Sequence, residues 1–331
     1  MAAANLLSPP VLCFLLGLVA GIVRSDLEIP EAVARALAVY LIFSIGFKGG
    51  VELANNGDLG ALVPLLLVAA ALSLLLPVPA FVLLRLLANV NRIDAGAIAA
   101  HYGSVSIVTY VAATSFLQSR GIAYEGFMTA VVAVMETPAI LTGLLLARAG
   151  QRGALDSRRR WELAHEIFAN GSVVLLLGSF AIGFVTGAEG MRRLAPVVTN
   201  GFTGLLCFFL LDMGLLVARR FAGFRTMGAG LVLFGVLMPL VGASAGLTAG
   251  LFLGLSVGGT ALLATLAGSA SYIAVPAAMR LALPRANPSL SLSLALGITF
   301  PFNLVLGIPL YVAVAERFSG WWEVWRAYLQ T

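Results

Sequence analysis

The sequence predicts an all-α polytopic membrane protein with about ten transmembrane helices, arranged as a 5+5 inverted repeat. Three observations lead to this prediction. Hydrophobic residues make up 60% of the 331-residue chain and charged residues only 11%, whereas a soluble domain is about one-quarter charged. Apolar segments long enough to cross a bilayer recur along the chain. Related elements also recur in the same order in the two halves.

Ten apolar segments define the expected crossings. They span residues 9–23, 30–46, 60–86, 94–117, 124–147, 168–187, 197–218, 226–253, 257–283 and 288–315. The first segment lacks a charged region before it and a cleavage site after it, so we expect it to be retained rather than removed as a signal peptide. Segments one and six are short, and their boundaries are the hardest to place.

The two halves carry matching polar elements in their fourth and fifth segments. Segment four contains Gly103, Ser104, Val105 and Ser106, and segment nine contains Gly268, Ser269, Ala270 and Ser271. Segments five and ten contain Thr137-Pro138 and Thr299-Phe300-Pro301. The glycine-to-proline separation is 35 residues in the first half and 33 in the second. Because each half has an odd number of crossings, the second copy is expected to be inverted.

The basic residues predict the orientation of the chain. If the central Arg-rich loop is cytoplasmic, fourteen of the 20 Lys and Arg residues lie on the cytoplasmic side. The positive-inside rule then places both termini outside. We divide the chain into a first repeat (1–148), a cytoplasmic Arg-rich loop (149–162), a second repeat (163–315) and an interfacial Trp-rich tail (316–331).

Small polar residues near the middle of segments four and nine predict that both helices are interrupted. At about 1.5 Å per residue, Gly103 lies roughly 13–15 Å into its segment, near the centre of a hydrocarbon core about 30 Å thick. A helix that restarts there presents free backbone N–H groups and a partial positive charge. We therefore expect the two Gly-Ser-x-Ser elements to bind a small anion. A Gly/Ser seam for close helix packing is the alternative.

A buried acidic residue in segment five, Glu136, predicts a site for a coupling ion. Carboxylates inside a membrane are energetically costly and mark ion pathways, and Pro138 leaves nearby carbonyl groups unpaired. A structural, hydrogen-bonded role for Glu136 is the alternative. The residues expected at the Na⁺ or coupling-ion site are Ser106, Thr109, Glu136, Thr137, Ser271, Tyr272 and Thr299. We expect no cofactor apart from Na⁺ as the coupling ion.

The sequence does not favour an enzyme. It contains no His-x-x-x-His or paired-Cys pattern, and its Gly-x-Ser-x-Gly match, residues 242–246, lies inside an apolar segment and not at a strand-to-helix elbow. The sequence therefore predicts neither a transition-metal site nor an activated nucleophile. The net charge of +5 comes mainly from loop arginines, which indicate topology and not a nucleic-acid surface. A membrane-embedded enzyme or a channel is the alternative from another class. His101 fits either a proton relay or a satisfied core imidazole.

Three stretches resemble the sodium-dependent bicarbonate transporter family, best known from carbon concentration in cyanobacteria. They are residues 101–106 (His-Tyr-Gly-Ser-Val-Ser), 135–139 (Met-Glu-Thr-Pro-Ala) and 269–280 (Ser-Ala-Ser-Tyr-Ile-Ala-Val-Pro-Ala-Ala-Met-Arg) with 285–289 (Arg-Ala-Asn-Pro-Ser). Residues 45–50 and 211–214 also fit the family. The resemblance covers essentially the whole chain.

The resemblance implies Na⁺-coupled uptake of bicarbonate by alternating access. It implies a gate built from segments one, two, six and seven, and a mobile core built from the other six. It further implies a homotrimer in a bacterial inner membrane and a PII-like regulatory protein at the cytoplasmic face. Tyr272 and Glu136 stand where cyanobacterial members have Asp, so a different small organic anion, coupled to Na⁺ or H⁺, is the alternative.

Overall fold

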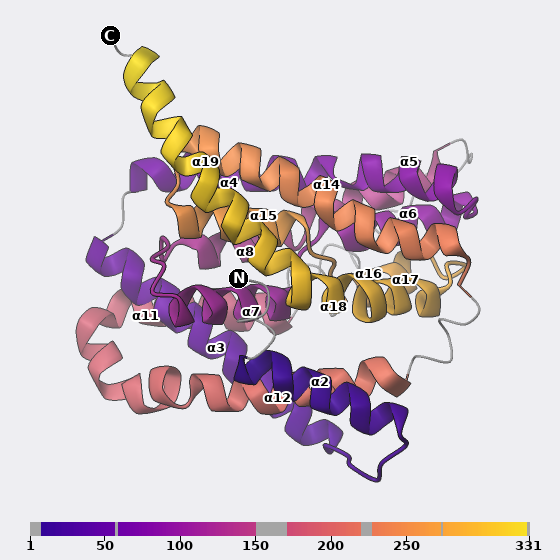
Figure 1. Ribbon diagram of the computed structural model, residues 1–331, viewed down its shortest axis with the longest axis horizontal. Helices are drawn as coiled ribbons and strands as arrows, with labels where there is room; N and C mark the ends of the chain where they lie inside the picture. Colours follow the sequence, from indigo (N-terminus) through magenta and orange to yellow (C-terminus); the bar gives the residue numbers. More distant parts are fainter. Residues whose placement is uncertain (1–7, 57–58, 150–170, 220–226, 273, 330–331) are drawn as a thin grey trace.

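The structure, a computed structural model, describes residues 8–329 except 57–58, 150–170, 220–226 and 273. Within these ranges the chain is helical and no strand occurs, as predicted (Figure 1). The first half contains α2 (Pro9–Ile22), α3 (Glu31–Asn56), α4 (Leu59–Leu75), α5 (Pro77–Leu87), α6 (Arg92–Gly103), α7 (Ile107–Ser119), α8 (Met128–Met135) and α9 (Pro138–Arg148). From residue 150 onward, the predicted Arg-rich loop lies outside the described residues.

The second half begins at α11 and ends with a long helix, α19, that continues through the predicted Trp-rich tail. Its elements are α11 (Gly171–Ala195), η1 (Pro196–Asn200), α12 (Phe202–Arg219), α14 (Ala229–Leu253), α15 (Val257–Ala267), α16 (Ala274–Ala282), α17 (Pro288–Leu294), η2 (Ala295–Thr299), α18 (Phe300–Phe302), η3 (Asn303–Gly307) and α19 (Ile308–Leu329).

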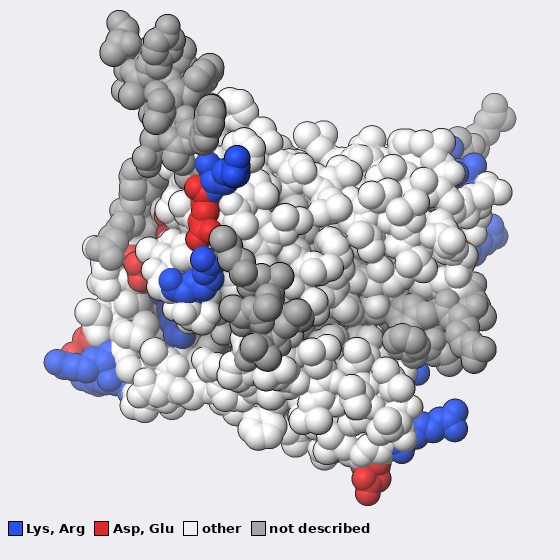
Figure 2. Space-filling model, viewed as in Figure 1, with Lys and Arg blue, Asp and Glu red and all other residues white. Residues whose placement is uncertain are grey.

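The described part of the chain contains 8 helical stretches that are long and apolar enough to cross a membrane. Two of the ten predicted crossings correspond to shorter apolar helices, α2 with 14 residues and α15 with 11. Large apolar side chains face outward: Leu67, Leu86, Leu145 and Val185 are 67%, 74%, 71% and 83% exposed. Figure 2 shows the described charged residues toward the two ends of the molecule, with a broad uncharged surface between them. These features identify a multi-pass membrane protein.

Two helices extend beyond their predicted ends. The second crossing was predicted to finish near residue 46, but α3 continues to Asn56 and carries Lys48 and Glu52. Both side chains line a cavity instead of facing lipid, which explains why the loss of hydropathy does not end the helix. The sixth crossing was predicted to finish near residue 187, but the helix passes a non-helical Gly187 (φ 54°) and continues to Ala195.

Four helices form two closely packed pairs, α2 with α12 and α3 with α11. A Cβ atom on Gly17 of α2 would overlap the carbonyl oxygen of Leu211 on α12. Similarly, a Cβ atom on Gly50 of α3 would overlap the carbonyl oxygen of Phe180 on α11. Glycine permits this close approach of backbones, which is a common way to associate helices in lipid.

The remaining helices form a body that is tied together at both ends by carboxylates. Asp94, at the start of α6, accepts a 2.7 Å hydrogen bond from the backbone N–H of Asn287, which caps α17. Glu125, in the loop before α8, accepts a 2.7 Å bond from the backbone N–H of Ser256, which caps α15. Each bond joins the first half of the chain to the second, so the two halves share one helical body.

Candidate substrate and ion site

The first Gly-Ser-x-Ser element separates two helices. Helix α6 ends at Gly103 and α7 begins at Ile107, while Ser104 and Ser106 have extended backbone angles. We call residues 104–106 the first break. The Ser106 hydroxyl accepts a 3.2 Å hydrogen bond from the backbone N–H of Thr109 and thus caps α7. Extended residues between two helical segments leave backbone groups without helical partners.

The second Gly-Ser-x-Ser element also follows the end of a helix. Helix α15 ends at Ala267, and the next helix, α16, begins at Ala274. We call residues 268–272 the second break. The Asn303 side-chain amide donates a 2.8 Å bond to the carbonyl of Gly268, and the Tyr311 hydroxyl donates a 2.8 Å bond to Asn303 Oδ1. A chain of neutral polar groups therefore holds the start of this break.

The two breaks lie in direct contact, although more than 160 residues separate them in sequence. The backbone N–H of Ser106 donates a 2.9 Å bond to the Ser269 hydroxyl. The backbone N–H of Ser271 donates a 2.8 Å bond to the His101 carbonyl. His101 Nδ1 lies 2.6 Å from the Ser271 carbonyl oxygen. Because a carbonyl oxygen only accepts, Nδ1 carries the proton, which fits the satisfied imidazole considered for His101.

Glu136 lies beside the first break, between α8 and α9. The Ser104 hydroxyl donates a 2.8 Å bond to the backbone carbonyl of Glu136. The residue is only 2% exposed, and its Oε2 atom has no hydrogen-bond partner among the described residues. A buried carboxylate oxygen without a partner is energetically unfavourable unless an ion or a proton compensates it. This atom is therefore open to a cation.

Three further residues were predicted at the ion site, and their surroundings differ. Thr299 donates a 2.8 Å bond to the Gly235 carbonyl and accepts a 2.7 Å bond from the Tyr102 hydroxyl. Tyr272 is half-buried with its hydroxyl enclosed near Ser106, but this hydroxyl makes no hydrogen bond of normal geometry within the described chain. Thr137 is half-buried and precedes Pro138, the first residue of α9.

Sequence reasoning missed three buried polar residues that hold the breaks and the Glu136 region. Ser73 on α4 donates a 2.8 Å bond to the Met135 carbonyl and accepts a 3.1 Å bond from the Ala139 N–H, on either side of Glu136. Tyr102 and Asn303 were the others. Ser73 and Asn303 are single polar residues within apolar runs, and Tyr102 directly precedes the first Gly-Ser-x-Ser element. These positions are the signal that could have drawn attention to the three residues.

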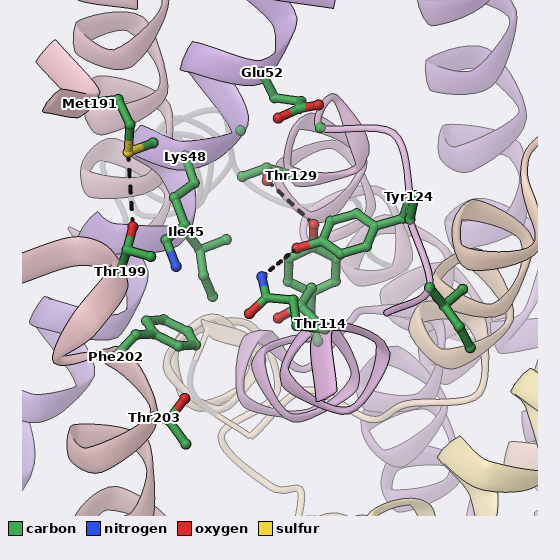
Figure 3. A pocket seen from close by; sticks show the side chains of 16 residues that line it. Ile45, Lys48, Glu52, Thr114, Tyr124, Thr129, Met191, Thr199, Phe202 and Thr203 are labelled. Carbon is green, nitrogen blue, oxygen red and sulfur yellow. Dashed lines mark hydrogen bonds between the residues drawn. The ribbon is translucent and has the colours of Figure 1, made fainter. Parts of the chain in front are cut away.

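A cavity of about 430 Å³ lies between the α3–α11 pair, α12 and helices α7 and α8 (Figure 3). We call it the α3/α7 cavity. Tyr110 of α7 lines it, one helical turn after Ser106, and its hydroxyl lies 3.3 Å from the Thr129 hydroxyl. His101 instead lines a separate cavity of about 130 Å³ with residues of α16 and α17. The two cavities therefore share no lining residue.

An apolar helical shell around buried polar breaks and a buried carboxylate defines a membrane transport protein. Comparison with protein families matches residues 9–316 to the Na⁺-dependent bicarbonate transporter superfamily. The chain belongs to this family, which confirms the resemblance found in the sequence. A comparison with curated proteins found no match. Across the described residues, no group of three or more His, Cys, Asp or Glu side chains is arranged to hold a metal ion.

Proposed function

We propose that this protein takes up bicarbonate together with Na⁺ by alternating access. The observation that carries the proposal is the contact between the breaks, in which the Ser106 N–H lies 2.9 Å from the Ser269 hydroxyl oxygen. Backbone N–H groups and hydroxyls from both halves of the chain thus converge at one buried place. Such groups bind small anions where helices begin.

The anion is held by the N-terminal ends of α7 and α16 and by the Ser104, Ser106, Ser269 and Ser271 hydroxyls. Opening of the paired breaks would release the Ser106 N–H and the Ser269 hydroxyl, which bond to each other in the present conformation. Na⁺ is held by the Glu136 carboxylate with oxygen atoms of the first break. The cation and the anion stabilise each other because each reduces the field that the other would face alone.

The ratio of Na⁺ to bicarbonate determines the driving force. One positive charge moving inward gains about 2.3 kcal/mol per 100 mV of membrane potential. One bicarbonate moving with one Na⁺ cancels this electrical contribution, and only the concentration gradient of Na⁺ remains. A second Na⁺ would restore the contribution of the membrane potential.

The architecture that we propose for this mechanism is a 5+5 inverted repeat with interrupted fourth and ninth crossings. Helices α2, α3, α11 and α12 act as the gate, and the remaining helices act as the mobile core. The glycine contacts within the α2–α12 and α3–α11 pairs support a rigid gate. We further propose both termini outside in a bacterial inner membrane, a homotrimer, and a PII-like partner at the cytoplasmic face.

A second candidate is coupled transport of another small organic anion with Na⁺ or H⁺. Tyr272 favours this second candidate, because its phenol hydroxyl lies near Ser106 at the position that resembles an Asp in cyanobacterial members of the family. One carboxylate fewer weakens a Na⁺ site, and Glu136 is able to carry a proton instead. An inward pH gradient in Na⁺-free buffer tests this candidate.

The principal experiment is uptake of radiolabelled bicarbonate into proteoliposomes with and without an inward Na⁺ gradient. We expect uptake that the gradient stimulates. In the Glu136→Gln variant, Na⁺ stimulation should be lost while the protein remains folded. Glu31→Gln, which removes an exposed carboxylate at the start of α3, is the control and should keep Na⁺ stimulation. Absence of bicarbonate uptake under every gradient would reject bicarbonate, and normal Na⁺ stimulation in Glu136→Gln would remove Glu136 from coupling.

A further inference from the structure

The α3/α7 cavity contains a cation to which the proposed transport site assigns no role. Lys48 of α3 lines this cavity. Of the 20 Lys and Arg residues in the sequence, Lys48 is the single lysine and all others are arginines. A chain that uses arginine at every other basic position has a lysine at the one that faces this cavity.

The Lys48 ammonium group is not neutralised by a carboxylate. Within the described residues it forms no ion pair. Glu52 lies one turn further along α3 and lines the same cavity, but its carboxylate and the ammonium group point apart (Figure 3). The Lys48 Nζ atom instead lies 4.3 Å from the centroid of the Phe202 ring on α12. A cation–π contact leaves N–H donors of the ammonium group free for another partner.

The surroundings of Lys48 suit a small, hydrated oxyanion. Thr129, Thr199 and Thr203 bring hydroxyl donors to the cavity from α8, η1 and α12. The volume of about 430 Å³ is large compared with the roughly 30 Å³ that one water molecule occupies in the liquid. An anion of three or four heavy atoms therefore fits with several waters.

We propose that Lys48 captures the transported oxyanion in the α3/α7 cavity before the anion reaches the paired breaks. This inference rests on the proposed function. Tyr110 lies at the cavity one turn from Ser106, so the captured anion is already close to the first break. A fixed positive charge raises the local concentration of anions and repels cations.

Lysine suits a temporary binding position better than arginine does. An ammonium group is a compact and strongly hydrated charge, whereas a guanidinium group holds an oxyanion with two parallel hydrogen bonds. A residue that must pass its ligand onward gains from the weaker, more flexible contact. Replacement by arginine should therefore preserve capture and slow release.

The first test measures anion binding beside Lys48 directly and does not require transport. An amine-acylating reagent is suitable because Lys48 and the amino terminus are the two primary amines of the chain. The full chain in detergent is treated with a water-soluble acetylating ester, and both sites are followed by mass spectrometry. We expect bicarbonate and nitrate to slow Lys48 acylation about threefold or more, and gluconate at equal ionic strength to have little effect. Acylation of the amino terminus, the internal reference, should not change.

Three outcomes of this test would overturn the inference. Equal rates with and without anions would show that no anion binds beside the amine. A Lys48 amine that does not react in anion-free buffer would show that the cavity is closed to small solutes. Protection by bicarbonate but not by nitrate would indicate addition of CO₂ to the amine and not capture by charge. Each result stands even if bicarbonate uptake itself is absent.

The second test compares transport by charge variants of the same cavity. Lys48→Gln should raise the half-saturating bicarbonate concentration about fivefold at low salt, with a smaller effect at high salt. Lys48→Arg should keep this concentration near the wild-type value and lower the maximal rate. Glu52→Gln removes the opposite charge and should lower the half-saturating concentration. An unchanged value in Lys48→Gln, or equal changes in Lys48→Gln and Glu52→Gln, would contradict capture by Lys48.

Discussion

The two breaks share a plan but differ in what surrounds them. A glycine at the N-terminal edge of each break packs against a proline on a neighbouring helix: a Cβ on Gly103 would overlap the Pro77 ring, and a Cβ on Gly268 would lie 2.7 Å from the Pro239 carbonyl oxygen. The first break is three residues long and adjoins the Glu136 carboxylate. The second break is longer and is held by a neutral amide.

This difference shows where charge is concentrated around the two breaks. Both breaks supply backbone groups and hydroxyls, but among the described residues one buried carboxylate, Glu136, adjoins them, beside the first break. The second break contributes hydroxyls, an amide and a phenol instead. We infer that the first break serves the cation and that both breaks serve the anion. The following substitutions test this division in order of decreasing expected effect.

The largest effect is expected from adding a methyl group to the glycine at each break. Gly103→Ala places a Cβ against the Pro77 ring and 2.8 Å from the Ala139 Cβ, and we expect a loss of about 2–3 kcal/mol of stability from overpacking. Gly268→Ala meets a carbonyl oxygen at 2.7 Å and should lose less, about 1–2 kcal/mol. Unfolding of both variants in detergent shows which of them has lost more stability. A Gly268→Ala variant that is the less stable of the two contradicts the prediction.

The next largest loss of stability is expected when the serine hydroxyls of the breaks are removed. Ser269→Ala removes the acceptor for the Ser106 N–H and the donor to the Leu266 carbonyl, so a buried N–H is left unpaired at a cost of about 1–2 kcal/mol. Ser104→Ala removes a single donor to the Glu136 carbonyl and should cost about 0.6 kcal/mol, the average for hydrogen bonds between membrane helices. Denaturation midpoints of the two alanine variants provide the comparison. Equal losses of stability would mean that the hydrogen bond between the two breaks contributes no more than the Ser104 bond to the Glu136 carbonyl.

A carboxylate placed in the second break should reduce the asymmetry. The Tyr272 hydroxyl is buried near Ser106, so Tyr272→Asp brings a second negative charge to the proposed cation site. We expect the half-saturating Na⁺ concentration for bicarbonate uptake to fall about fivefold, which corresponds to about 1 kcal/mol. Tyr272→Asn, which has a similar shape without charge, is the control. Equal Na⁺ dependence in the two variants would separate Tyr272 from the ion site.

The smallest effect is expected at the outer end of the polar chain that holds the second break. Tyr311→Phe removes the hydroxyl that donates to Asn303 Oδ1, and we expect a loss of about 0.6 kcal/mol. The amide of Asn303 keeps its bond to the Gly268 carbonyl, so transport should be nearly unchanged. A loss of uptake in a folded Tyr311→Phe protein would show that the hydroxyl has more than a structural role.

The polar elements could be identified in the sequence because composition and spacing report on them directly. An apolar run interrupted by Gly103-Ser104 is visible without any structure, as is an acid such as Glu136 inside an apolar segment. Helix ends were harder to predict, since hydropathy falls where α3 leaves lipid contact and lines a cavity with Lys48, while the helix itself continues. The bonding partners of Ser73 were not predictable because its hydrogen bonds join segments 62 to 66 residues apart.

The glycine contacts of the α2–α12 and α3–α11 pairs have a consequence for evolution. At Gly17 and Gly50, the opposite carbonyl oxygen already occupies the space of a methyl group. Even alanine, the smallest replacement, would force the backbones apart, so these positions tolerate almost no drift. Lipid-facing residues such as Leu86 and Val185, which touch little of the protein, are free to exchange among apolar types. The slowest-changing part of such a chain need not be the part that touches its cargo.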